Sequence, residues 1–499
     1  MNRSDRLETA STEISASAHS GNATLAWLPV KAFELLAAQP ATLVGLSQAE
    51  RDRVVVSAVV DQHGCEHVVS RVGDTRWDFT VDVWTPNTPA SGKLVDWRAA
   101  ASPAFLNDIR ASLYVWLKRG RENAQKPIAR SVVDVGKQAA QLVAHLTSKG
   151  LKSFSDVTAL HLSDYIAELK KTHRPESIAR RLYIVDLVWD FHEEVLWPLP
   201  QHPWAGQSLV RACGVVKGGG WDGELPSGLT AKTPVIPPSV QATLFAHAEA
   251  HLIRSEQYLL ARDRDGGSPT SFALTALRDS IAYLIQVTTG MRNSELAGIK
   301  SGSWRTEIRD GVTFHWIRTT EHKTKKGEVD YLAPPQALKA LEILQKYAEP
   351  LQARLRDEIR WLESQLALAG ESVAVLSSGM TRVSALQRLV VARKSVNGLF
   401  LGVSKKASDH TNFGRIEVLG ISGFGAAMDR FALIAGVDWN LTTHQCRRTF
   451  AWTVANTRLG KRGLLFLKWQ LKHSTMTMTQ LYASNPNQDA VLYESTRIC

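Results

Sequence analysis

Apolar residues recur at helical spacing between residues 101 and 198. Leu142 and Leu146 fall on one face of a helix that Gly150 ends. A second helix begins at Pro175 and repeats its apolar residues at steps of three and four: Ile178, Leu182, Val185 and Trp189. The pattern predicts a helical domain over about 101–200.

Residues 1–100 follow a different pattern. The first twenty residues are rich in Ser, Thr and Ala without an apolar core, so we expect a disordered leader rather than a secretion signal there. Further on, β-branched residues fill Arg53–Val60, and apolar residues then alternate with polar ones: Trp77, Phe79, Val81 and Val83. We predict an N-terminal accessory region containing a small antiparallel sheet.

Gly and Pro without apolar periodicity indicate a linker over 201–237, so a second large domain is expected over 238–499. Within it, one long helix is predicted to begin at Pro350 and end at Gly370. Its apolar stripe steps by three or four residues: Leu351, Leu355, Ile359, Leu362 and Leu366.

Composition excludes several classes of protein. A chain of 499 residues with 44% hydrophobic and 21% charged residues is a folded protein with more than one domain. It has no apolar run long enough to cross a membrane, and its four cysteines form no CxxC pair, so we expect a cytoplasmic protein without disulfide or zinc scaffolds. The net charge of +11 favours a polyanionic partner such as nucleic acid.

Two groups of histidines are candidate metal ligands. His247 and His251 lie four residues apart on a predicted helix, but the intervening Glu249 points elsewhere, so a solvated face is favoured. His63 and His67 flank a Gly turn with Cys65 between them and no nearby fourth ligand. No metal site is therefore predicted.

The first candidate functional residue is Arg292, which the sequence places in a tight turn between two helices. Gly290 is predicted to end one helix in a left-handed cap, with Asn293 or Ser294 capping the next. Arg292 lies between the two helices, and Glu295 is within reach to orient its guanidinium. An arginine held in this way can bind phosphate or carboxylate oxygens.

Two further clusters lie near the C-terminal end. His444 and Arg447 share one face at the start of a helix whose core contacts we assign to Phe450, Ala451 and Val454. His473 follows an apolar helix over 464–471, and Tyr482 comes soon after it. Each element alone is common in proteins of this size.

The order and spacing of these elements resemble the tyrosine recombinases, the phage-integrase family. The matching segments of the sequence are Gly290-Met291-Arg292-Asn293-Ser294-Glu295-Leu296, a Lys-rich turn, His444-x-x-Arg447, and His473 followed by Tyr482. The resemblance covers about 238–499 and, more loosely, 101–198. It implies a mainly α fold with a small antiparallel β-sheet, in which a helical core-binding domain precedes a DNA breaking-rejoining catalytic domain.

The resemblance implies DNA cleavage without a metal or nucleotide cofactor. A tyrosine attacks the scissile phosphate, which gives a 3′-phosphotyrosyl enzyme and a free 5′-hydroxyl. Carried over by position, Tyr482 is the nucleophile, Arg292 and Arg447 clamp the non-bridging oxygens, and His444 and His473 position and exchange protons.

The family's general acid is a lysine on a β-hairpin turn, which Lys323 matches best here and Lys325 matches as an alternative. The sequence departs from the family pattern at Lys472, where glycine is common before the histidine. The number of residues between Arg292 and His444 also exceeds the family's usual separation. We interpret about 336–400 as a helical insertion whose stripe contacts another protomer or a partner.

The resemblance also implies the partners. We expect double-stranded DNA, a homo-tetramer on two DNA sites, a possible partner recombinase or directionality factor, and a bacterial, DNA-associated protein. Basic residues near the Pro175 helix are candidates for DNA-backbone contacts: Lys170, Lys171, Arg174, Arg180 and Arg181. The alternatives are a type IB topoisomerase, a telomere-resolving enzyme, and a catalytically silent DNA-binding subunit.

Overall fold

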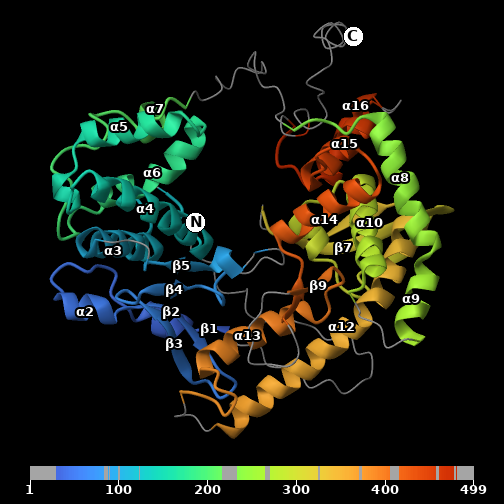
Figure 1. Cartoon of the computed structure of the whole chain (residues 1–499), viewed down its shortest axis with the longest axis horizontal. Coiled ribbons are helices and arrows are strands. Elements are labelled where there is room, and N and C mark those ends of the chain that lie inside the picture. The colour runs from blue at the N-terminus through green and yellow to red at the C-terminus, as the bar shows by residue number, and fades with distance from the viewer. Residues whose placement is uncertain are drawn as a thin grey trace, which may run out of the picture.

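The computed structural model describes residues 30–83, 88, 90–98, 102–122, 124–215, 233–264, 270–323, 326–369, 374–404, 415–456, 460–476 and 479. Within these residues the chain is mainly α-helical with small antiparallel sheets, so the predicted fold class is confirmed (Figure 1). The predicted leader, residues 1–20, and residues 216–232 of the predicted linker lie outside the described residues.

Short strands around an aromatic core form the N-terminal part. Strands β1, β2 and β3 pair in that order, and β4 pairs with β5, all antiparallel. Trp77 of β4 packs edge-on against Trp97, with ring centroids 5.3 Å apart. The predicted antiparallel element is confirmed, although β4 ends at Asp78 and so excludes Phe79, Val81 and Val83. The elements are β1 (Val30–Lys31), α1 (Phe33–Ala37), α2 (Gln48–Arg53), β2 (Val55–Val60), β3 (Glu66–Arg71), β4 (Arg76–Asp78), the 3-10 turn η1 (Ala90–Lys93) and β5 (Leu94–Asp96).

The predicted helices of the next hundred residues are present and share a hydrophobic core with the strands before them. That core joins Trp77 and Trp97 to Phe105, Leu142 and Leu182, all of which are buried. The stretch consists of α3 (Pro103–Arg119), α4 (Ala129–Ser148), the 3-10 turn η2 (Phe154–Asp156), α5 (Ala159–Lys170), α6 (Pro175–Asp190) and α7 (Leu209–Ala212).

A second core organises the C-terminal part around α10 (Phe272–Thr289), which contacts α8 (Pro238–Ile253), α12, α14 and α15. The predicted hairpin is also present, because β7 pairs antiparallel with both β6 and β8. The remaining elements are α9 (Ser255–Arg264), α11 (Asn293–Ala297), β6 (Trp304–Arg309), β7 (Val312–Glu321), β8 (Gly327–Ala333), α12 (Pro335–Leu368), α13 (Arg382–Ser395), β9 (Leu401–Ser404), β10 (Arg415–Val418), α14 (Ile421–Ile434), α15 (Thr443–Ala455) and α16 (Gly460–Gln470).

The long helix α12 begins at Pro335, so the prediction that Pro350 starts it is wrong. Pro350 lies inside the helix and has no N–H to donate to the carbonyl of Lys346. Arg262 of α9 supplies the missing donor, because its Nη1 lies 3.0 Å from that carbonyl oxygen. Buried residues before and after the proline, such as Leu344 and Leu351, hold both halves of the helix against the core.

The apolar stripe of α12 is buried within its own chain. Leu351 and Leu355 join the C-terminal core, whereas Leu362 and Leu366 pack in a separate cluster with Val59 of β2. The predicted contact of an exposed stripe with another protomer is therefore wrong. The sequence period identified the stripe but not the N-terminal sheet that covers its second half.

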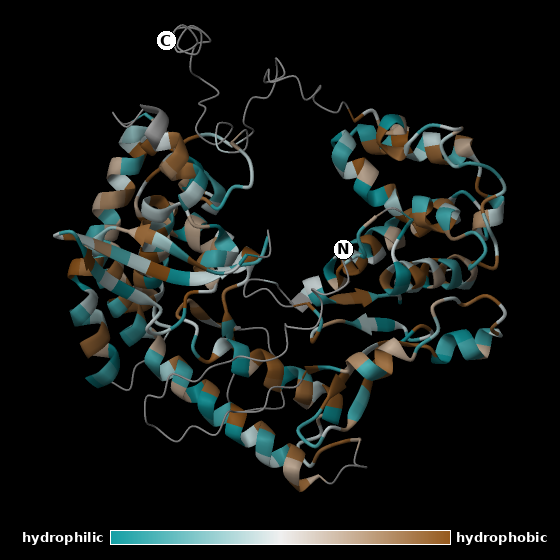
Figure 2. Cartoon of the chain, turned by 180° about the vertical axis from the view of Figure 1, so that it is seen from behind, coloured by the Kyte–Doolittle hydropathy of each residue, from teal (hydrophilic) through white to brown (hydrophobic). Residues whose placement is uncertain are grey.

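We call this contact between the N-terminal sheet and α12–α13 the seam. Besides Val59, its buried apolar residues come from α12, α13 and the segment before α13: Leu362, Leu366, Leu376, Ala385, Leu386 and Leu389. A buried pair crosses it, because Arg382 Nη1 lies 3.6 Å from Asp61 Oδ2. Figures 1 and 2 show α13 beside β3, with polar and apolar residues alternating along α12.

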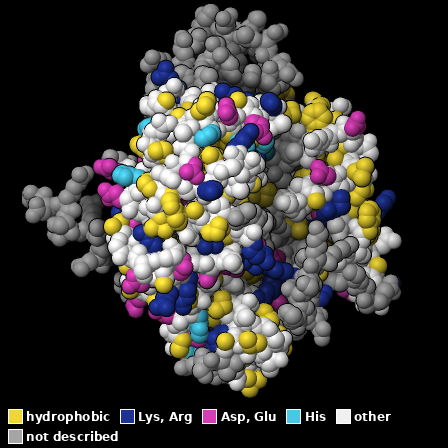
Figure 3. All heavy atoms as spheres, turned by 60° about the vertical axis from the view of Figure 1, so that its left-hand side comes forward, with side chains coloured by type: hydrophobic (Ala, Val, Ile, Leu, Met, Phe, Trp, Pro, Cys, Tyr) yellow, Lys and Arg dark blue, Asp and Glu magenta, His cyan; other side chains and the backbone are white. Residues whose placement is uncertain are grey.

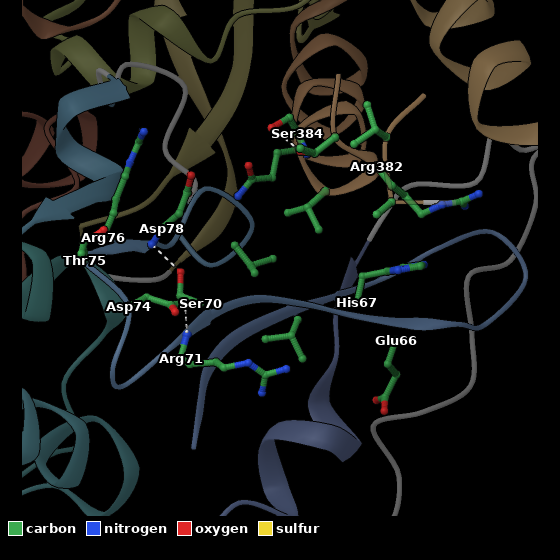
Figure 4. A pocket seen from close by; sticks show the side chains of 17 residues that line it. Glu66, His67, Ser70, Arg71, Asp74, Thr75, Arg76, Asp78, Arg382 and Ser384 are labelled. Atoms are coloured by element: carbon green, nitrogen blue, oxygen red, sulfur yellow. Dashed lines mark hydrogen bonds between the residues drawn. The ribbon is translucent and has the colours of Figure 1, made fainter. Parts of the chain in front are cut away.

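A pocket of about 780 Å³ opens beside the seam. Residues of β3 and β4 line one side, and residues 374–387 line the other, with Arg71, Asp74 and Arg76 along the sheet and Arg382 opposite (Figure 4).

Among the described residues, no helix combines the length and apolar character needed to cross a membrane.

Candidate active site

The turn between α10 and α11 places Arg292. Gly290 has a φ of +69°, and its N–H donates to the carbonyl of Gln286 at 2.9 Å, which is the predicted left-handed cap. A Cβ at Gly290 would lie 2.5 Å from Phe450 Cδ1, so the close approach of α15 also requires glycine. Arg292 itself takes the cap position of α11, because Glu295 accepts its backbone N–H at 2.6 Å, so the prediction that Asn293 or Ser294 caps this helix is wrong.

A buried carboxylate fixes the orientation of this arginine. Glu295 Oε1 accepts from Arg292 Nη1 at 2.6 Å, and Glu295 Oε2 accepts from the hydroxyl of Tyr331 at 2.6 Å. The same Oε2 lies 3.9 Å from Arg447 Nη1, so one carboxylate serves both arginines. The predicted orienting role of Glu295 matches this geometry.

Arg447, in the first turns of α15, links three segments from the centre of the site. Its side chain is 1% exposed and donates to the carbonyls of Gly290 and Leu471, at 2.6 Å for the second. The core contacts predicted for this helix are present, because Ala451 packs with Leu471 and with Phe450 and Val454.

His473 is held in its neutral form. Its Nε2 lies 3.1 Å from Arg447 Nη2, and a guanidinium can only donate, so Nε2 accepts. The proton then lies on Nδ1, which is 3.1 Å from Thr479 Oγ1. Burial and the positive charges of Arg447 and Arg292 lower the pKa of His473 to about 3, so the ring is uncharged at neutral pH.

His444 lies on the same face of α15 as Arg447 and is exposed. Partial loss of hydration and the nearby charges of Arg447 and Arg448 lower the pKa of His444. Lys323 lies in the exposed turn between β7 and β8, where the hairpin prediction placed it. The structure thus brings Arg292, Arg447 and His473 together, and the positive charge of Lys323 acts on both His444 and His473.

Two predicted residues, Tyr482 and Lys325, lie outside the described part of the chain.

The predicted DNA contacts gather where α5 ends and α6 begins, four of them exposed and Arg181 half-buried: Lys170, Lys171, Arg174, Arg180 and Arg181. Figure 3 shows a dense group of Lys and Arg side chains near the middle of the face that it draws. Within the described residues, no group of three or more His, Cys, Asp or Glu side chains could hold a metal ion.

The predicted site residues include neither Glu321 nor Lys472. Glu321, at the end of β7, is buried and lies 3.2 Å from Arg292 Nη1. At Lys472 the departure from the family's glycine leaves two interpretations open from the sequence, an added phosphate contact or a neutral replacement. Lys472 has a φ of +56°, and its Nζ donates to the carbonyl of Asp330 at 2.7 Å and lies 4.1 Å from the Trp469 ring centroid. Burial lowers the pKa of Lys472 to about 8.

The left-handed backbone at Lys472 gives a stability prediction. Alanine there would keep the strained φ and lose the ammonium contacts, whereas glycine would lose the contacts but relieve the strain. We therefore expect Lys472→Gly to be more stable than Lys472→Ala by about 1 kcal/mol in urea unfolding.

Lys468 provides the matched control, because it lies in the right-handed backbone of α16. There glycine should be less stable than alanine by about 1 kcal/mol. The same order of stabilities at both positions would contradict the strain at Lys472.

No family model and no curated protein matches the chain. Solved structures of recombinases and of a transposon integrase are similar to it at low identity. A XerH site-specific recombinase bound to palindromic difH substrate is 14% identical, over 79% of this chain and 86% of that chain, with a TM-score of 0.40. The Tn1549 transposon integrase with transposon right end DNA is 15% identical, over 78% and 98%, with a TM-score of 0.37. XerA recombinase is 14% identical, over 74% and 90%, with a TM-score of 0.25.

Proposed function

We propose that this protein is a site-specific DNA recombinase that cuts and rejoins DNA through a 3′-phosphotyrosyl intermediate. The observation that carries the proposal is the convergence of Arg292 and Arg447 on one buried carboxylate, Glu295, with His473 beside Arg447. These groups come from three separate parts of the sequence. Two arginines beside a neutral imidazole are suited to binding a phosphodiester whose negative charge grows in the transition state.

The proposed reaction needs no external energy source. The Tyr482 oxygen attacks phosphorus, the bond from phosphorus to the 5′-oxygen breaks, and the Tyr482 proton passes to a neutral imidazole. Lys323 donates a proton to the leaving 5′-oxygen. A 5′-hydroxyl from another strand then reverses the step and releases the tyrosine. Such exchange fits integration or excision of a mobile element by a tetramer on two DNA sites.

A covalent trapping assay tests the nucleophile. The probe is a set of duplexes from the sequence flanking the gene, each with a nick or a bridging 5′-phosphorothiolate that prevents religation. We expect wild-type protein to form a protein–DNA adduct on a denaturing gel, and Tyr482→Phe to bind DNA without forming it, because phenylalanine has no hydroxyl.

Tyr493→Phe is the matched control, because it removes the other tyrosine near the C-terminal end of the sequence. An adduct that persists in Tyr482→Phe and disappears in Tyr493→Phe would overturn the assignment of the nucleophile. DNA binding with no adduct on any probe would favour the silent accessory subunit. Relaxation of any supercoiled plasmid would favour a type IB topoisomerase, and hairpin-ended products would favour a telomere-resolving enzyme.

A further inference from the structure

Glu321 occupies an unusual place for an acidic residue. It is the last residue of β7, where the strand gives way to the turn that carries Lys323, and such a position is normally solvated. Its side chain nevertheless has 0% exposure. A buried carboxylate loses its hydration and is retained only where it is paired with charges or hydrogen-bond donors.

The partners of Glu321 come from both sides of the site. Oε1 lies 3.2 Å from Arg292 Nη1, which belongs to the turn between α10 and α11. Oε2 lies 3.4 Å from the backbone nitrogen of Lys326, at the far end of the hairpin turn. The hairpin closes beside it, because Glu321 pairs with Gly327 across the strands. One carboxylate therefore joins the arginine to both ends of the lysine turn.

Orienting Arg292 does not by itself require Glu321. Glu295 already accepts from Arg292 at two places, the backbone nitrogen and Nη1, and both distances are 2.6 Å. Glu321 approaches the same Nη1, so both carboxylates bind one nitrogen of the guanidinium. What Glu321 adds is a connection from the arginine to the hairpin.

We propose that Glu321 is a positioning residue that fixes the Lys323 turn to Arg292, so that the phosphate clamp and the proton donor are set as one unit. This inference rests on the proposed function. A lysine on an exposed turn samples many positions, and a misplacement of about 1 Å at a reacting group can cost on the order of 100-fold in rate. Tying both ends of the turn to the clamp limits that motion.

The test compares two leaving groups. On a normal phosphodiester the 5′-oxygen needs a proton as it departs, whereas a bridging sulfur at the same position departs without one because thiols are far more acidic than alcohols. We expect Glu321→Gln to slow adduct formation on the normal nicked duplex by on the order of 100-fold. On the phosphorothiolate duplex its rate should return to within about threefold of wild type, as for Lys323→Ala, because no proton transfer is needed.

Two controls bound the interpretation. Arg292→Ala should be slow on both substrates, because it removes a clamp residue. Glu328→Gln should match wild type on both, since Glu328 lies on the same hairpin with its side chain 75% exposed. A Glu321→Gln defect of equal size on both substrates, or no defect, would overturn the positioning role.

Hydrogen exchange on DNA-free protein gives a readout that does not depend on the reaction. Glu321→Gln should speed exchange at the Lys326 amide and across the turn, while the amides of α10 stay protected as in wild type. Unchanged exchange in the turn would also overturn the proposal. If wild-type protein forms no adduct on any duplex, the proposed function fails, and exchange still tests the tether.

Discussion

Replacing Arg447 with alanine is expected to slow DNA cleavage by about 100- to 1000-fold, because it removes a preorganised donor to the charge that grows on the phosphate. The same change should lower the free energy of unfolding. Arg447 donates to the carbonyls of Gly290 and Leu471 from a position that is 1% exposed. Each buried carbonyl left without a donor costs about 1–3 kcal/mol.

The substitution Arg447→Lys distinguishes the effect of positive charge on cleavage from the effect of hydrogen-bond geometry. Arg447→Lys keeps the positive charge, but one ammonium cannot reproduce a planar fork that reaches Gly290, Leu471 and His473 together. We expect its cleavage rate to stay closer to that of Arg447→Ala than to wild type, measured by adduct formation at a temperature where both variants are folded by circular dichroism.

Arg360→Ala serves as the control, because that arginine lies on α12 with its side chain 76% exposed. It should cleave and unfold like wild type. Wild-type cleavage by Arg447→Lys would mean that charge alone suffices and that the hydrogen-bonded fork has no part in catalysis.

The sequence predicted those parts of the site that depend on local rules. A left-handed cap at Gly290 follows from glycine at the end of an apolar helical period, and the shared face of His444 and Arg447 follows from their spacing. The meeting of Arg292, Arg447 and His473 was expected only through the family resemblance. Neither periodicity nor spacing brings distant segments of a chain together.

The parts that sequence reasoning missed depend on tertiary contacts. The sequence does not indicate a role for Glu321, because an acidic residue at a strand end is expected to be solvated. Only the structure shows that Arg292 lies beside it. The sequence predicts that Pro350 starts a helix because proline removes a backbone donor, yet Arg262 replaces that donor from another helix. At Lys472 the departure from glycine is visible in the sequence, but the left-handed backbone, which would favour glycine there, is not.

Leu362→Ala is expected to loosen the seam between the N-terminal sheet and α12–α13. Leu362 is 0% exposed in a cluster with Val59 and Leu386, and truncating a buried leucine costs about 2–5 kcal/mol. Because the cluster lies between two larger cores, we expect the substitution to weaken the attachment of the cores to each other more than the packing within either core. We expect faster limited proteolysis and a larger radius of gyration in solution scattering, while far-ultraviolet circular dichroism stays close to wild type.

Leu368→Ala is the matched control, since Leu368 lies on the same helix and is 80% exposed. It should change neither proteolysis nor the radius of gyration. A double-mutant cycle with Val59→Ala then tests contact across the seam. If the two sides pack together, the combined loss of stability should differ from the sum of the single losses by about 0.5 kcal/mol or more. Strict additivity, with an unchanged radius of gyration in Leu362→Ala, would mean that the seam does not hold the N-terminal sheet to α12 in solution.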